Sequence, residues 1–281
     1  MVQKFKFFFL YSFLSLSVLQ AEQLTVDLFP VMHSAPGIYE DEKLYEALMR
    51  SQHQLMMYLI EHSETPVFLE SLGTVIDQET YFDPKHPDYQ ERDLLRKSIQ
   101  LNFPDGVPRL YEDFTDEQKF IVSQSDMAVE VLFQLGILNA MYPTNTASEY
   151  KEYVLKNQEN PNLGRLLGIA RGAVSPVSDT EALEAQLLGR EVFLMRERAA
   201  LREIADFSKK NPGVKKVALV FGKSHDFLKY RNDFPELNIR KVNVKRYDRT
   251  LSTILNVEPR YELSYFNETT QRFETLPGLP F

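Results

Sequence analysis

The sequence predicts an α/β fold in which a mixed or mostly parallel sheet is flanked by helices. Short apolar runs typical of buried strands alternate along the chain with longer segments of helical periodicity, and this order is characteristic of α/β proteins. The 281 residues are 43% hydrophobic and 26% charged, as in ordinary globular proteins with a sizeable core. Disordered and repeat architectures are therefore excluded.

Four segments are predicted as strands. Leu24–Pro30 contains β-forming residues and stops at a proline, and Thr65–Glu70 is a short apolar run that ends in a carboxylate. Lys216–Gly222 (KVALVFG) is the clearest buried strand in the chain. Ile239–Arg246 alternates polar and apolar positions, which predicts an edge strand.

The remaining periodic segments are predicted as helices. They cover residues 42–60, 91–100, 115–135, 145–162, 178–208 and 224–230. In the first of these, leucines at spacings of four and seven lie on one side, and His53 falls on the opposite side, where we expect it to be solvated. Ser178 and Glu181 form a capping box at the start of the long helix.

The domain organisation is predicted as a signal peptide followed by one domain. Lys4 and Lys6 precede the apolar run Phe7–Leu19, so residues 1–21 are expected to be removed on export to the periplasm or the exterior of a bacterium. An uncleaved anchor is the alternative, because Leu19 is bulky for the cleavage site. Residues 22–281 are predicted as a single α/β domain with a helical insertion at about 73–177, and no later stretch is expected to span a bilayer.

Charge and cysteine content restrict the chemistry. A formal net charge of −8 leaves no basic field for a phosphate backbone, so nucleic acid is not expected as a partner. The absence of cysteine excludes thiol nucleophiles, disulfides and thiolate-bound metals. Any imidazole-dependent site must use one of five histidines: His33, His53, His62, His86 and His225.

Three chemistry-bearing residues follow predicted strands. His33 follows the first strand, Glu70 ends the second, and His225 lies three residues beyond Gly222. Ligands of α/β sheets bind beyond the carboxyl ends of the strands, so these side chains are expected to line one surface cleft. They are candidates for ligands of a divalent metal such as Zn, Mn or Co, or for a base with its orienting partner. The alternative is that the histidines are ordinary loop residues.

The long predicted helix has charges inside an apolar stripe. Four leucines fall within about 40° of one another at 100° per residue: Leu183, Leu187, Leu194 and Leu201. Arg190 and Glu197 lie in the same stripe. A charge that faces a core must be paired or face a cavity. These two residues are therefore either part of a site or a structural bridge across two turns.

Four segments together resemble the erythromycin esterase, ChaN-like and TraB/Tiki superfamily: the first strand followed by His33, the Phe68-Leu69-Glu70 strand end, the helical stretch Arg196–Ile204, and Val217–His225 with its Gly-x-x-His ending. The resemblance covers both ends of the predicted α/β core and not the insertion. It implies one cleft in which His225 and His33 are metal ligands or general bases and Glu70 is a ligand or base. It also implies that Arg196 and Glu197 form an orienting pair.

The sequence departs from the superfamily pattern at two places. Val31-Met32 stands where a small residue or glycine ordinarily precedes the early histidine. Arg190-Glu191 offers a second register for the helix motif, and the stripe places Arg190 together with Glu197 on the inward side. Both registers remain open at this stage.

The resemblance implies several functions, because metal-dependent proteolysis, metal-free ester hydrolysis and haem binding all occur on such scaffolds. We expect an exported hydrolase of an ester or amide bond, peptide bonds included, that uses the His and Glu residues with or without a divalent metal on a small-molecule or peptide substrate. The alternative is a haem- or iron-binding protein with Tyr39 or His33 as axial donor, or an inactive interaction protein. The oligomeric state does not follow from the sequence.

Overall fold

The main sheet has six strands. The computed structural model describes residues 23–31, 41–70, 74–124, 127–170, 174–222, 225–242, 264–267 and 272–275. The strand order is β3-β4-β2-β5-β1-β6. The strands are β1 Leu24–Val31, β2 Val67–Leu69, β3 Ile76–Asp77, β4 Ala140–Pro143, β5 Lys216–Gly222 and β6 Leu237–Lys241. All neighbouring strands pair in parallel except β3 and β4, which confirms the predicted mixed, mostly parallel sheet.

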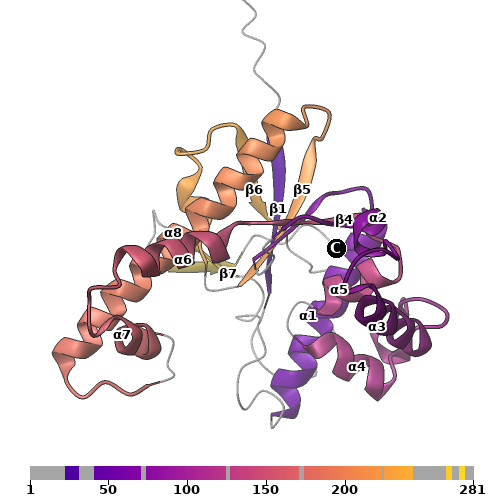
Figure 1. The fold of residues 1–281 in the computed structure, drawn as a ribbon, viewed down its shortest axis with the longest axis horizontal. Coiled ribbons are helices and arrows are strands. Elements are labelled where there is room, and N and C mark those ends of the chain that lie inside the picture. The colour runs from indigo at the N-terminus through magenta and orange to yellow at the C-terminus, as the bar shows by residue number, and fades with distance from the viewer. Residues whose placement is uncertain are drawn as a thin grey trace, which may run out of the picture.

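Helices cover the sheet from both sides. They are α1 Glu42–Glu61, α2 Gln78–Tyr81, α3 Tyr89–Asn102, α4 Asp116–Ser123, α5 Met127–Gln134, α6 Thr146–Lys156, α7 Leu163–Ala170 and α8 Asp179–Lys210, with 3-10 turns η1 Tyr111–Asp113 and η2 Leu228–Tyr230. Figure 1 shows α6, α7 and α8 on one side of the sheet and α1, α3, α4 and α5 on the other. A separate antiparallel pair joins β7 Ser264–Asn267 and β8 Arg272–Thr275.

Successive side chains of the central strands point to opposite faces of the sheet, which divides the core into two layers. Val26 and Leu28 of β1 belong to the cluster that packs on the C-terminal half of α8, whereas Phe29 and Val31 belong to the cluster under α1, α4 and α5. Both sets are at most 6% exposed. A strand buried on both faces reads as a near-continuous apolar run, which is why β1 and β5 are recognisable from sequence.

The segment predicted as a helical insertion also contributes strands. Within residues 73–177 the chain forms β3 and β4, and β4 pairs in parallel with β2. The predicted signal peptide, residues 1–21, lies outside the described residues. Among the helices that are described, none is both long and apolar enough to cross a bilayer.

His53 is buried, contrary to the solvated position expected for it. Its side chain is on the side of α1 away from the sheet, but α4 and the segment before it cover that side. The residue is 2% exposed, and its Nε2 lies 3.0 Å from the carbonyl oxygen of Pro108. The prediction was wrong because α1 packs on two sides rather than one.

The apolar stripe of α8 is covered over only part of its length. Leu201 and Glu197 are buried against the sheet side, whereas Leu183, Leu187 and Arg190 are exposed. The expected inward position of Arg190 is therefore wrong. The reason is that α8 has 32 residues and runs past the end of the sheet that its C-terminal half covers.

The helix predicted over 115–135 is interrupted. It forms α4 and α5, and α4 ends at Ser123, whose Oγ donates to the carbonyl oxygen of Phe120. The hydroxyl of serine and the carboxylate of aspartate form hydrogen bonds with nearby backbone groups, which compete with the hydrogen bonds of a helix. A cluster of such residues follows Val122 in the sequence. The helix predicted over 224–230 is reduced to the single turn η2.

Candidate functional site

Glu70 links the carboxyl ends of two parallel strands. It follows β2, on the same face as Phe68, which is the face that α8 covers. Its Oε2 accepts a hydrogen bond of 2.8 Å from the backbone amide of Gly222 at the end of β5. Its Oε1 accepts from Nη2 of Arg196 on α8. The residue is 7% exposed, so this buried carboxylate is held at a fixed position between β2, β5 and α8.

His225 is fixed by a tight turn and by two aromatic rings. Its backbone amide donates to the carbonyl oxygen of Gly222 at 3.1 Å, which turns the chain immediately after β5. Phe193 of α8 stacks on the imidazole with ring centroids 4.4 Å apart, and Phe221 approaches it edge-on at 4.6 Å. The side chain is 3% exposed. The surface-cleft position expected for this residue is therefore corrected to a buried one.

Glu197 is the orienting partner of the imidazole. Its Oε1 lies 3.3 Å from Nδ1 of His225 and accepts a hydrogen bond of 2.9 Å from the amide of Asp226. Its Oε2 accepts from the hydroxyl of Tyr230 at 3.0 Å and pairs with Nζ of Lys229 at 2.7 Å. Burial raises the pKa of the Glu197 carboxyl, but the bonds from His225, Lys229 and the amide of Asp226 outweigh burial, so the pKa lies below its usual value. Glu197 is therefore ionised at neutral pH.

The ionised state of Glu197 assigns the proton on the imidazole. A carboxylate only accepts hydrogen bonds, so Nδ1 of His225 carries hydrogen and donates to Glu197. Nε2 lies 3.6 Å from Oε1 of Glu70, which is too long for a direct hydrogen bond. Among the described residues no other partner contacts Nε2. With hydrogen on Nδ1 of the neutral ring, Nε2 is the nitrogen that has the lone pair.

The charged side chains around the imidazole form two ion pairs that do not include the ring. Glu70 pairs with Arg196, and Glu197 pairs with Lys229. Two carboxylates and two cations cancel, so these four side chains carry no net charge together. Arg196 is 30% exposed and Lys229 is 25% exposed, whereas both acids and the histidine are at most 8% exposed. Arg196 thus connects the buried groups to solvent.

We call Glu70, Arg196, Glu197 and His225 the edge cluster, because they meet where β2 and β5 end. Four of the five residues expected at the site are thus brought together. The fifth, His33, lies outside the described residues, as does Tyr39. The structure also selects the helix register: Arg196-Glu197 reaches the cluster, whereas Arg190 and Glu191 are exposed.

The metal site expected from His33, Glu70 and His225 stays a prediction, because His33 lies outside the described residues. In the part of the chain that the structure describes, no three histidine or acidic side chains are placed to hold a metal ion. Both oxygens of Glu70 accept hydrogen bonds, from Gly222 and from Arg196. A cation that binds beside Oε1 would therefore have to displace the guanidinium of Arg196.

Three contacts that complete the cluster were missed by sequence reasoning. Phe193, Lys229 and Tyr230 hold the imidazole or its acid partner, but none is part of a motif. One signal was present: an acid inside an apolar stripe, such as Glu197, requires several buried partners. Aromatic and basic residues in the turn after the strand, at Phe227–Tyr230, were candidates for that role.

A second concave region lies elsewhere. A cleft of about 590 Å³ is formed where α3 ends and α4 begins, and it is lined by residues that include Asn102, Asp105 and Thr115. Its charged lining residues are all acidic, and none of the lining residues is a histidine. This cleft therefore offers carboxylates and no imidazole.

Comparison of the chain with models of known protein families, with curated proteins and with solved structures found no match.

Proposed function

We propose that the protein is a hydrolase of ester or amide bonds in which His225 is the general base. The observation that carries the proposal is the position of the imidazole: Nδ1 faces the ionised Glu197 at 3.3 Å, and Nε2 is left without a direct hydrogen bond among the described residues. A base held by an orienting acid is the arrangement that activates water or a hydroxyl nucleophile. The expected resemblance to esterases and peptidases of the same superfamily is part of this proposal.

The reaction follows from the charges of the cluster. Nε2 of His225 takes a proton from water as the water oxygen bonds to the substrate carbonyl carbon. The imidazolium that forms then lies between Glu70 and Glu197, so both carboxylates stabilise it. When the carbonyl is restored, the bond to the leaving alkoxide or amine breaks, and that group takes the proton from Nε2.

Arg196 is the group that meets the substrate first. Only its Nη2 is bonded to Glu70, and the side chain extends from the buried cluster to solvent. Its remaining N–H groups are placed to donate to the carbonyl oxygen on which negative charge develops. The proposal therefore assigns the base to His225, orientation to Glu197, and binding of the oxyanion to Arg196.

The test measures hydrolysis of a panel of p-nitrophenyl esters and short peptides by the purified protein, with chelator and with added Zn²⁺, Mn²⁺ or Co²⁺. His225→Gln is expected to lower kcat/KM by about 10²- to 10⁴-fold. His86→Gln, in a loop far from the cluster, is the matched control and should keep full activity. Thermal unfolding of both variants shows that each is folded.

Two results would contradict the proposal. If no substrate in the panel is cleaved, or if His225→Gln retains the wild-type rate, His225 is not a general base. Activity that survives the chelator supports the metal-free mechanism. Activity that requires the metal would assign a ligand role to the cluster and replace the base mechanism given above.

A further inference from the structure

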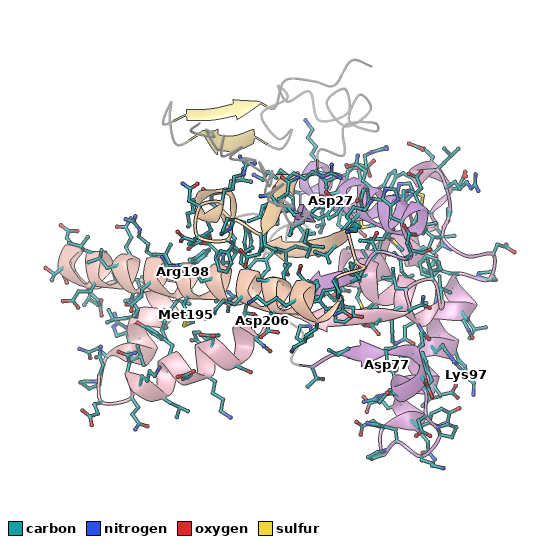
Figure 2. The ribbon with its side chains drawn as sticks, turned by 90° about the horizontal axis from the view of Figure 1, so that it is seen from above. Asp27, Asp77, Lys97, Met195, Arg198 and Asp206 are labelled. Atoms are coloured by element: carbon teal, nitrogen blue, oxygen red, sulfur yellow. The ribbon has the colours of Figure 1, made fainter. Side chains whose placement is uncertain are left out.

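Helix α8 carries one apolar stripe, and the sheet covers only half of it. Because α8 leads directly into β5, it runs antiparallel to that strand and extends past its carboxyl end. The 32-residue helix is about 48 Å long, whereas the seven residues of β5 span about 23 Å. Leu201 lies on the sheet at 0% exposed, whereas Leu187 and Leu183 of the same stripe are 59% and 56% exposed. Figure 2 shows this end of α8 extending away from the strands.

The exposed part of the stripe is on a segment of α8 that packs against α7 on its opposite side. Leu188 and Val192 of α8 pack against Leu163 and Leu167 of α7, on the side of α8 opposite Leu183. Arg165 of α7 forms a bidentate pair with Glu181, with Nε to Oε1 at 2.5 Å and Nη2 to Oε2 at 3.0 Å. The exposed leucines are therefore on a braced helix and not on a fraying end, so little order is lost when they are covered.

Opposite charges lie at the two ends of this exposed stripe. Asp179 is at the start of α8 and Arg190 is eleven residues further on, and both are exposed and within about 40° of Leu183. The side chain of neither residue makes a hydrogen bond or ion pair with any other residue that the structure describes. The midpoint of Leu183 and Leu187 is position 185, and the midpoint of Asp179 and Arg190 falls between positions 184 and 185.

We propose that this stripe, formed by Asp179, Leu183, Leu187 and Arg190, binds the same stripe of a second copy of the chain in an antiparallel helix pair. Because the leucines and the charges share one midpoint, a two-fold axis there places each leucine pair in contact. The same axis places Asp179 opposite the partner's Arg190 and Arg190 opposite the partner's Asp179. A parallel pair would place like charges together. The surface is therefore complementary to itself in one orientation only.

The proposed dimer is expected to be weak because its interface is small. A stable protein interface buries about 800 Å² on each partner, and a helix contact of this length buries less. The expected dimer has a dissociation constant in the micromolar range and weakens as salt is added, because its outer contacts are exposed ion pairs. The inference does not depend on His225 or on hydrolysis.

Sedimentation equilibrium of the purified protein over a range of concentrations tests the proposal. Wild type is expected to dimerise. Arg190→Asp alone and Asp179→Arg alone should each raise the dissociation constant by about tenfold or more, since each creates two repulsive contacts. The double variant Asp179→Arg/Arg190→Asp restores opposite charges at both contacts and should return the constant to the wild-type value.

A matched pair of leucine variants tests the apolar part. Leu187→Glu should abolish association, whereas Leu155→Glu, at a position on α6 that is 55% exposed, should not. Circular dichroism confirms that each variant is folded. A wild-type protein that stays monomeric at concentrations of about 1 mM overturns the proposal, and so does a dimer that the double charge reversal fails to restore.

Discussion

The carboxylate of Asp27 and the carboxylates of the edge cluster are alike in burial and differ in surroundings. Asp27, in the middle of β1, is 0% exposed and accepts hydrogen bonds from Tyr58 of α1 and from Arg240, its neighbour on β6. We call these three residues the mid-sheet cluster. Both clusters therefore contain a buried carboxylate and an arginine whose side chain also reaches solvent.

The difference lies in what surrounds each carboxylate. The mid-sheet cluster is within a strand, and its donors keep their protons at neutral pH: burial, and then the bond to Asp27, raise the pKa of Tyr58. The edge cluster lies beyond the strand ends and contains an imidazole, a ring whose two nitrogens can donate and accept hydrogen bonds. Burial and ion pairing alone therefore do not distinguish the two clusters; the imidazole at the strand ends does.

The largest effect on stability is expected at the mid-sheet cluster. Asp27→Ala removes the acceptor of three charge-assisted hydrogen bonds in the middle of the sheet, so it should lower the free energy of unfolding by about 3 kcal/mol. Urea unfolding measures this cost. Activity per folded molecule should not change. Asp206→Ala, at an exposed position of α8, is the control and should leave the unfolding midpoint in place (Figure 2).

Glu197→Gln should affect both stability and activity. The amide keeps the shape but cannot replace the negative charge that faces His225 and Lys229, so unfolding should become easier by about 2 kcal/mol. The proposed base also loses its orienting partner, so kcat should fall more than KM changes. A variant with wild-type kcat would place Glu197 with Asp27 as a purely structural acid.

The same variant changes the pH dependence of stability. Because the pKa of Glu197 is lower in the folded state, its ionised form stabilises the fold above about pH 4.5, and that contribution is lost as the pH falls through the folded-state value. Wild type should therefore lose stability more steeply than Glu197→Gln below pH 4.5. Parallel curves for the two proteins in urea titrations at a series of pH values would contradict this assignment.

The parts of the fold that could be predicted are those with a long local signal. β5 is recognisable because six of its seven residues, Val217–Gly222, are uncharged and buried. By contrast, β3 and β4 have two and four residues, which is too short for any periodicity to be measured. The position of a short strand depends on which neighbour offers it a pairing edge, and sequence alone does not contain that information.

The edge cluster could be predicted in outline and not in detail. Glu70 and His225 follow strands, and carboxyl ends of parallel strands meet at one edge, so their proximity follows from topology. The roles of Phe193 and Lys229 depend on where α8 crosses the strand ends and on how η2 turns. The exposure of Leu187 likewise depends on where the sheet stops beneath α8.

The smallest expected effect concerns His53, the second buried histidine. Burial lowers the pKa of His53, although the bond to the carbonyl of Pro108 and the charge of Glu112 act in the opposite direction. The unfolded chain therefore takes up a proton on this ring at a higher pH than the folded protein does. Its neutral form contributes stability above about pH 6.5, and that contribution falls as the pH drops toward the folded-state value.

His53→Gln separates this proton effect from the loss of packing. At pH 8 the ring is neutral in both states, so the difference between variant and wild type there measures packing and hydrogen bonding alone. As the pH is lowered from 6.5 to 5, wild type should lose stability and the difference should shrink, because glutamine takes up no proton. A difference that stays constant over this range would mean that His53 titrates alike in the folded and unfolded chain. In that case burial under the segment around Pro108 does not exclude its charged form.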